Sequence, residues 1–143
     1  MQTGVYTPGE EVTVDDVIVT SPDAGYGFFL QDPTGTESAG VWVYYGSVTA
    51  WDETGAGVNP GDTVTVTGTY AEYQDSGSTG TLTEIEITDA GGLTITGTGT
   101  MPAPVVITDA DFADDATMEL YEAMLVQVDN VTASGDDLSL IHI

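Results

Sequence analysis

The sequence contains no lysine, no arginine and no cysteine in 143 residues. An average chain of this length carries about 17 Lys and Arg, so their absence is a property of the protein and not a chance fluctuation. Without Lys there is no Schiff base and no P-loop lysine, and without Arg there is no bidentate phosphate clamp. Without Cys there is no disulfide and no thiolate metal site.

Catalytic side chains are equally scarce. The single histidine, His142, stands next to the end of the sequence, so a Ser-His-Asp triad has no base. Paired carboxylates can hydrolyse glycosides, but among 24 Asp and Glu residues some pair lies at a suitable distance by chance. We therefore expect no enzyme. We also expect no membrane insertion, because no apolar run approaches the ~20 residues of a membrane span.

The charge is acidic along the whole chain, from Glu10 to Asp137, and the formal net charge is −24. Hydrophobic residues make up 41% of the sequence, which suffices for one folded domain with a modest core. A chain with this charge repels itself unless salt or bound cations compensate. Affinity for phosphates comes mostly from Lys and Arg, so nucleic acids are not expected as partners.

Alternating residues predict an all-β domain. The alternation in Val12–Val19 changes phase at Asp15-Asp16, which is typical of a long strand bent by a β-bulge. Thr63–Tyr70 alternates strictly, with threonine on its outer face. Further strands are predicted over Phe28–Gln31, Val41–Tyr45, Leu82–Ile87, Leu93–Thr96 and, as a closing strand, Met124–Val128.

One segment alone favours helix. Thr108 offers an N-cap with acids after it, and Ala116–Met124 has few β-branched residues. The element order therefore predicts an OB-like, partly open β-barrel of five to six strands, with one short helix before the last strand. The barrel domain is placed at 12–132, after an N-terminal lead-in at 1–11. Residues 133–143 are interpreted as a truncated linker, the start of a further segment, or non-native sequence.

Five segments resemble the OB-fold modules of bacterial secreted and cell-surface proteins: VTVDDVIVTSPDAGYGFFLQDP, GVWVYY, PGDTVTVTGTYAEY, LTEIEI and ELYEAMLVQVDNV. Such modules also occur beside extracellular endonuclease/exonuclease/phosphatase-type domains. The resemblance covers residues 12–131 and implies an accessory role at an extracellular or cell-surface location. The catalytic domain of some relatives is not in this chain, so nuclease activity is not implied. The glycine usual after the Glu of their "YEG" motif is Ala123 here, which puts a local turn in doubt.

Aromatic residues are the candidate ligand-binding side chains. In Val41–Tyr45, Trp42 and Tyr44 share the face opposite the two valines, so they point outward if the valines line the core. Together with Phe28 they would form a stacking platform. Stacking contributes ~1–3 kcal/mol per nucleic-acid base, which here must overcome the repulsion of the −24 charge. A sugar ring or a neighbouring protein needs no cation, and simple packing under loops is the alternative role.

Acidic residues supply a candidate metal site at Glu72, Asp75 and Glu84. If Gln74–Thr81 connects two antiparallel strands, Glu72 and Glu84 come opposite or diagonal to one another. Like charges in these positions destabilise a sheet unless a metal lies between them, and Asp75 in the loop would complete the site. Carboxylates suit Ca²⁺, which is the expected cofactor; solvation in salty water is the alternative at each acid. Further candidates are Asp32, Asp109 and Asp111.

These features predict a non-catalytic, cation-stabilised OB-like module. It would serve adhesion, matrix or fibre assembly, or the presentation of neighbouring domains. Its expected partners are divalent cations, copies of itself, other surface proteins or polysaccharide. The alternative is an accessory substrate-binding domain of a secreted hydrolase or nuclease.

Overall fold

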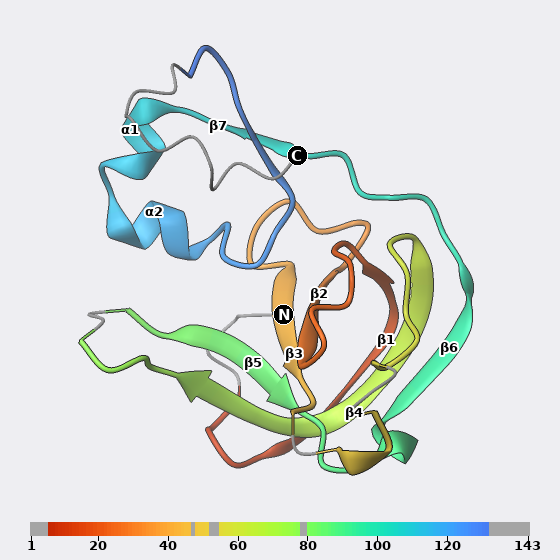
Figure 1. The fold of residues 1–143 in the computed structure, drawn as a ribbon. Helices are drawn as coiled ribbons and strands as arrows, with labels where there is room; N and C mark the ends of the chain where they lie inside the picture. Colours follow the sequence, from red (N-terminus) through yellow and green to blue (C-terminus); the bar gives the residue numbers. More distant parts are fainter. Residues whose placement is uncertain (1–5, 47, 52–54, 78–79, 132–143) are drawn as a thin grey trace, which may run out of the picture.

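The computed structural model describes residues 6–46, 48–51, 55–77 and 80–131 (Figure 1). The segment 133–143, with His142, lies outside the described residues. The elements in chain order are β1 (Glu11–Val19), β2 (Gly27–Gln31), β3 (Gly40–Tyr44), η1 (Thr49–Trp51), β4 (Asp62–Tyr73), β5 (Leu82–Glu86), η2 (Ala90–Gly92), β6 (Leu93–Thr98), β7 (Val105–Ile107), α1 (Asp109–Phe112), α2 (Asp115–Glu119) and β8 (Val126–Val128).

Five strands form a ring in the order β1-β2-β3-β5-β4, and β4 pairs back with β1. All of these pairs are antiparallel except β3–β5, which is parallel. The ring is weakest at β1–β2, where the register includes two residue pairs, Ile18 with Gln31 and Val19 with Leu30. The prediction of an all-β, OB-like, partly open barrel is confirmed.

The first strand bends as its sequence predicts. Its register with β4 shifts between Val14 and Val17, and Asp16 has a positive φ of 55°. The neighbouring Asp15 faces β4, where its carboxylate accepts a hydrogen bond of 2.9 Å from the Thr65 hydroxyl. The phase slip at these two acids is therefore a β-bulge, which lets one strand pair with both β2 and β4.

The long strand β4 joins the ring to an additional edge strand. One edge of β4 pairs with β1, from Thr63 to Thr69. The other edge pairs first with β6 and then with β5. The turn between β5 and β6 is capped by Asp89, whose carboxylate accepts from the Gly91 amide at 2.7 Å. A Cβ on Gly92 would lie 2.6 Å from the Thr67 carbonyl oxygen. Glycine is therefore required at position 92 by close packing on β4.

The C-terminal segment differs from the prediction in two respects. The single expected helix is divided into α1 and α2, because Asp114 starts a second helix: its carboxylate accepts from the Ala116 amide and the Thr117 hydroxyl. The predicted closing strand does not close the barrel. Instead, β8 pairs in parallel with β7 in a separate two-stranded sheet. No helix in the described ranges is long and apolar enough to cross a membrane.

Figure 1 shows this segment next to the barrel, and hydrogen bonds attach it there. The Leu125 amide donates to the buried Gln31 side chain at 2.8 Å, and the Thr83 amide donates to the Glu122 carboxylate at 3.1 Å. The Gly40 end of β3 lies so close that a Cβ there would be 2.4 Å from the carbonyl carbon of Ala123. These contacts occupy polar groups at the barrel edge, which explains why no closing strand is needed there.

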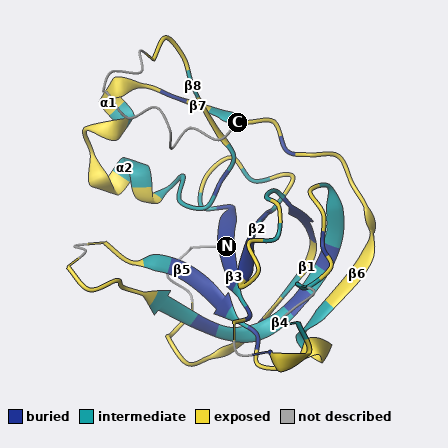
Figure 2. Cartoon of the chain, in the orientation of Figure 1, coloured by how far each residue is buried: buried dark blue, intermediate teal, exposed yellow. Residues whose placement is uncertain are grey.

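The core fills the inside of the ring (Figure 2). It is built from alternate positions of β1 to β5, with Phe28, Tyr45 and Ile87 among its largest fully buried side chains. Opposite positions of β2, β3 and β5 face outward, and the candidate site is formed on that outer face.

Candidate ligand-binding groove

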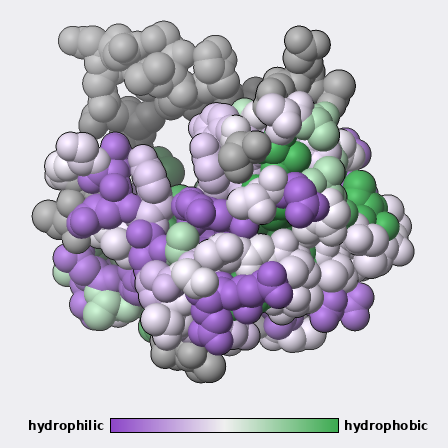
Figure 3. Space-filling model, turned by 90° about the horizontal axis from the view of Figure 1, so that it is seen from below, coloured by the Kyte–Doolittle hydropathy of each residue, from purple (hydrophilic) through white to green (hydrophobic). Residues whose placement is uncertain are grey.

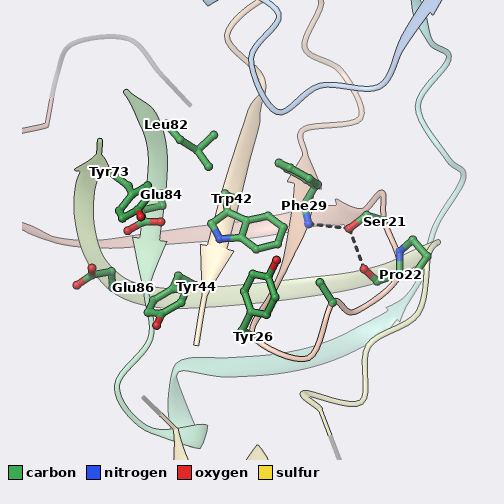
Figure 4. Close-up of a pocket in the computed structure, with 11 residues that line it drawn as sticks. Ser21, Pro22, Tyr26, Phe29, Trp42, Tyr44, Tyr73, Leu82, Glu84 and Glu86 are labelled. Carbon is green, nitrogen blue, oxygen red and sulfur yellow. Dashed lines mark hydrogen bonds between the residues drawn. The ribbon is translucent and has the colours of Figure 1, made fainter. Parts of the chain in front are cut away.

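An open groove of about 740 Å³ crosses the outer faces of β2, β3 and β5 (Figure 4). Aromatic rings dominate its lining, and the β1–β2 loop forms one wall. We call it the aromatic groove. Its lining residues are Ser21, Pro22, Ala24, Tyr26, Phe29, Trp42, Tyr44, Tyr73, Leu82, Glu84 and Glu86. A cleft of this size holds a small molecule or a short stretch of a polymer.

Strand register places Trp42 at the centre of the groove. Trp42 lies opposite Phe29 on β2, and their ring centroids are 4.6 Å apart in an edge-on contact. Tyr26 lies on the other side, with its centroid 6.0 Å from that of Trp42. The indole extends over Gly27, where a Cβ would come within 2.2 Å of its ring. Glycine at this position therefore allows the ring to lie flat against β2.

The rings differ in exposure, and the difference defines a floor and two rims. The side chain of Trp42 is only 9% exposed, whereas Tyr26 and Tyr73 are 56% and 52% exposed. Figure 4 shows Tyr73 beside Glu84 on one side of Trp42 and Tyr26 next to the indole on the other, with Ser21 and Pro22 beyond it. A ligand would therefore contact the two tyrosines most extensively and rest on the indole edge.

Two of the three predicted ligand-binding residues line this groove. Trp42 and Tyr44 point outward as expected, while Val41 and Val43 lie in the core. Phe28 does not join them: it is fully buried on the core face, opposite Val43. Phe29 occupies the place expected for Phe28, because alternation puts Phe28 on the same face of β2 as the core residue Leu30.

Tyr26, Phe29 and Tyr73 were not predicted from the sequence. A signal existed for two of them. Alternation puts Phe28 on the same face of the strand as Leu30, and Phe29 on the same face as Gln31. Because Leu30 is more apolar than Gln31, the sequence favours Phe28 for the core and Phe29 for the surface. The outward threonines of β4 continue in steps of two to Tyr73. Tyr26 precedes β2 and carries no such periodic signal.

The wall of the groove is fixed by hydrogen bonds at the β1–β2 loop. The Asp23 carboxylate accepts from the Gly25 amide at 2.9 Å, the Ala56 amide at 2.7 Å and the Tyr45 hydroxyl. The Ser21 hydroxyl oxygen accepts from the Phe29 amide at 2.9 Å (Figure 4). The loop is thus held from β2, from β3 and from the segment after η1, so the groove is formed before any ligand arrives.

Two carboxyl groups stand beside the rings. Glu84 is 4% exposed and pairs in register with Trp42, and Glu86 pairs with Tyr44. The pKa of Glu84 is raised to about 7, chiefly by burial and then by the charge and hydrogen bond of Glu86, with a smaller contribution from the charge of Glu72. The groove therefore combines aromatic surface with a pair of acids and has no basic residue.

The predicted metal ligands are not brought together. Glu72 pairs with Thr83, whereas Glu84 pairs with Ala71, so the two glutamates point to opposite faces of the sheet. Glu72 accepts hydrogen bonds from the hydroxyls of Tyr70, Thr81 and Thr83 instead. These residues do not fit a shared Ca²⁺ site, and within the described ranges no group of three acidic or histidine side chains could hold a metal ion.

Three of the remaining candidate acids accept local hydrogen bonds. The Asp75 carboxylate is exposed and accepts from the Ser76 amide at 2.8 Å. The Asp32 carboxylate accepts from the amide and hydroxyl of Thr34, both at 2.8 Å, which lowers its pKa. Asp111 accepts from the amide and hydroxyl of Thr108, with the same effect on its pKa. Their local hydrogen bonds account for these acids without a metal.

Acidic and other hydrophilic side chains cover much of the molecule. Figure 3 shows them spread over the face seen from below the barrel, with hydrophobic residues in small separate areas. Because the sequence has no Lys or Arg, none of this surface offers a fixed positive charge apart from the chain terminus.

No protein-family model and no curated protein matches this chain. The site must therefore be interpreted from its own geometry.

Proposed function

We propose that this chain is a non-catalytic binding module that holds a segment of polysaccharide in the aromatic groove. The observation that supports this most directly is the arrangement of the rings: two exposed tyrosines flank a tryptophan floor in one preformed cleft. Sugar rings present apolar faces that stack on such side chains, and their hydroxyls donate hydrogen bonds to carboxylates. Glu84 and Glu86 are placed to accept them.

The surface charge favours this ligand class over nucleic acid. Single-stranded nucleic acids bind OB-type barrels through aromatic stacking within a positive groove. Here the groove contains two acids and belongs to a chain of net charge −24. A neutral or cationic polymer does not suffer that repulsion.

The resemblance of the sequence to secreted and cell-surface modules supports an extracellular setting. In that setting the module would attach a larger protein to a glycan matrix, or present a neighbouring domain to it. The same groove would serve the alternative role, in which the module delivers a polymeric substrate to a secreted hydrolase. Cations would stabilise the module in either role by screening its charge.

Calorimetric titration with a panel of neutral, cationic and anionic oligosaccharides tests the proposal. We expect at least one to bind, and we expect Tyr26→Ala and Tyr73→Ala each to weaken binding about 3- to 10-fold, because each removes one stacking face. Phe112→Ala is the matched control: Phe112 is 50% exposed but lies on α1, away from the groove. The proposal fails if no oligosaccharide binds, or if all three variants weaken binding alike.

The edge strand β6 favours assembly as a second candidate function. Five of its six residues are exposed, including Ile95, and none is charged (Figure 2). An unprotected strand edge can pair with a strand of another chain. Sedimentation at low and high salt tests this: association that grows with salt and is lost in Ile95→Lys supports it, and a monomer at all salt concentrations rejects it.

A further inference from the structure

We propose that the aromatic groove selects a glycan that carries free, protonated amino groups, and that Glu84 and Glu86 bind the ammonium group. This inference rests on the proposed function and adds the chemical class of the ligand. The two carboxyl groups project from alternate positions of β5 onto the outer face, where they lie in register with Trp42 and Tyr44.

The hydrogen bonding of Glu84 is the observation that carries the inference. Its side chain is almost completely buried in the groove lining. Among the described residues, its only hydrogen-bond partner is the side chain of Glu86, another acid. A buried carboxyl group normally has N–H or O–H donors around it. No N–H or O–H group of the described residues donates to Glu84, which leaves its side chain dependent on a proton or on an external donor.

Other acids of the chain show the contrast. Asp23, Asp32 and Glu72 each accept two or more hydrogen bonds from amides or hydroxyls of the protein. Their positions are explained by the fold. Once both are ionised, two adjoining carboxyl groups without such donors repel one another and destabilise the unliganded sheet. A bound cation removes that repulsion, so its binding would be favoured.

An ammonium group matches the walls of this pocket better than a metal ion does. Ca²⁺ takes roughly 6–8 oxygen ligands, whereas the neighbours of the two glutamates are Trp42, Tyr44, Tyr73 and Leu82. Aromatic faces attract an organic cation directly. The N–H groups of a primary ammonium can donate to both carboxylates while its carbon skeleton packs on the rings.

A glycan is favoured over a basic peptide because of the shape of the lining. Rings follow one another from Tyr73 across Trp42 to Tyr26 and Phe29, and Ser21 and Pro22 line the end beyond them. This length suits successive pyranose rings, of which one places its amino group at the glutamates. The net charge of −24 would also attract a polymer with repeated ammonium groups from a distance.

Two hexasaccharides separate the ammonium group from the sugar ring: the β-1,4 hexamer of glucosamine and the hexamer of N-acetylglucosamine. They share ring and linkage, and only the first is cationic when its amines are protonated. We expect the glucosamine hexamer to bind at least about 10-fold more tightly at moderate salt. Glu84→Gln and Glu86→Gln should each reduce that preference several-fold. Glu37→Gln removes an equal charge from an exposed loop and should leave the preference unchanged.

Each outcome bears on a different statement. If both hexamers bind equally and Tyr73→Ala weakens both, the polysaccharide function stands and the amino-group inference is wrong. If neither these hexamers nor any other sugar binds, the proposed function itself fails. If hexalysine binds as tightly as the glucosamine hexamer, charge alone suffices and the assignment to a glycan is overturned. Thermal melting of each variant checks that the barrel is folded.

Discussion

The hydroxyl of Tyr45 donates a hydrogen bond to the carboxylate of Asp23 and so joins the barrel core to the wall of the aromatic groove. Tyr45 follows directly after β3 and is 1% exposed, and its ring packs edge-on against Trp51 at 5.1 Å. The pKa of Tyr45 is raised to about 12, chiefly by burial and then by the hydrogen bond and charge of Asp23. The phenol therefore stays protonated, and a donor, at neutral pH.

Tyr45→Phe should loosen the groove wall as well as the fold. The substitution keeps the ring and removes the donor to a partly buried carboxylate, which costs about 2 kcal/mol. Urea unfolding should show a lower midpoint with an unchanged slope. Ligand affinity should fall as well, because Asp23 also holds Gly25 and Ala56. Tyr26→Phe, at a half-exposed ring, is the control for stability, and equal midpoints for the two variants would contradict this account.

Ala123→Gly should stabilise the protein. Ala123 has a φ of 57°, in the left-handed region where a Cβ costs roughly 1–2 kcal/mol. Glycine removes that strain but adds unfolded-state entropy, so we expect a net gain of about 0.5–1 kcal/mol. Thermal or urea unfolding measures the gain.

Ala113→Gly is the matched control for that prediction. Ala113 ends α1 with an ordinary φ of −81°, so glycine gains nothing there and costs conformational entropy, with an expected loss of about 0.5–1 kcal/mol. A loss of stability in Ala113→Gly together with a gain in Ala123→Gly supports the strain argument. A loss of stability in Ala123→Gly would contradict it.

Strand periodicity made most of the barrel predictable from the sequence. The phase slip at Asp15-Asp16 identified the bulge of β1, and the alternation of Val41–Tyr45 placed Trp42 and Tyr44 on the outer face. Both are local patterns whose period of two fixes the side of the sheet. The Gly91-Gly92 break was also readable from the sequence, although its structural reason is a distant contact: close packing against Thr67 excludes a side chain at Gly92.

Features that depend on pairing between distant strands were not predictable in the same way. Whether Glu72 and Glu84 share a face depends on the exact register between β4 and β5. In the structure Glu72 pairs with Thr83 and Glu84 pairs with Ala71, one residue away from a direct Glu72–Glu84 pair. A slip of one position moves each side chain to the other face. Strand Val126–Val128 was recognised, but its partner β7 lies about twenty residues earlier, and the alternation within β8 carries no information about it.

Stability should fall as the pH rises from about 4.5 to about 7. Glu84 has its ordinary pKa of 4.5 in the unfolded chain and a pKa of about 7 in the folded protein, chiefly because it is buried. The folded state therefore binds the proton more tightly, and this contribution is complete below pH 4.5 and lost above pH 7. We expect the loss to be on the order of 1 kcal/mol, because the groove is open to water. Melting temperatures across this range measure it.

Glu84→Gln separates this contribution from the general relief of repulsion at low pH. A neutral amide has no charge to bury, so the variant should match the original protein near pH 4 and exceed its melting temperature near pH 8. Both proteins share every other carboxyl group, including Glu122, whose pKa is also raised by burial. A constant difference between the two proteins across the range would show that Glu84 does not titrate as described.

Salt should stabilise the protein through screening. At about 1 M NaCl the Debye length is about 3 Å, compared with about 30 Å at 0.01 M, so repulsion among the acids nearly vanishes and the melting temperature should rise by several degrees. CaCl₂ should add a further increment at matched ionic strength, because divalent ions associate more strongly with carboxylates. Asp75→Asn should leave that increment unchanged, because Asp75 does not form a metal site with Glu72 and Glu84. Loss of the increment in this variant would establish a metal site in the loop.

Single-stranded DNA should not bind, even at about 0.01 M salt where electrostatic attraction is strongest. The rings of the groove offer stacking, but a bound strand would place phosphates beside Glu84 and Glu86 within a field of 24 acids. Fluorescence anisotropy with a labelled oligothymidine tests this, and the Glu84→Gln, Glu86→Gln double variant tests the cause. If that variant binds weakly while the original does not, the two groove acids exclude phosphates locally. If both remain inert, the charge of the whole surface decides, and tight binding by the original protein would refute the electrostatic argument from which the choice of ligand follows.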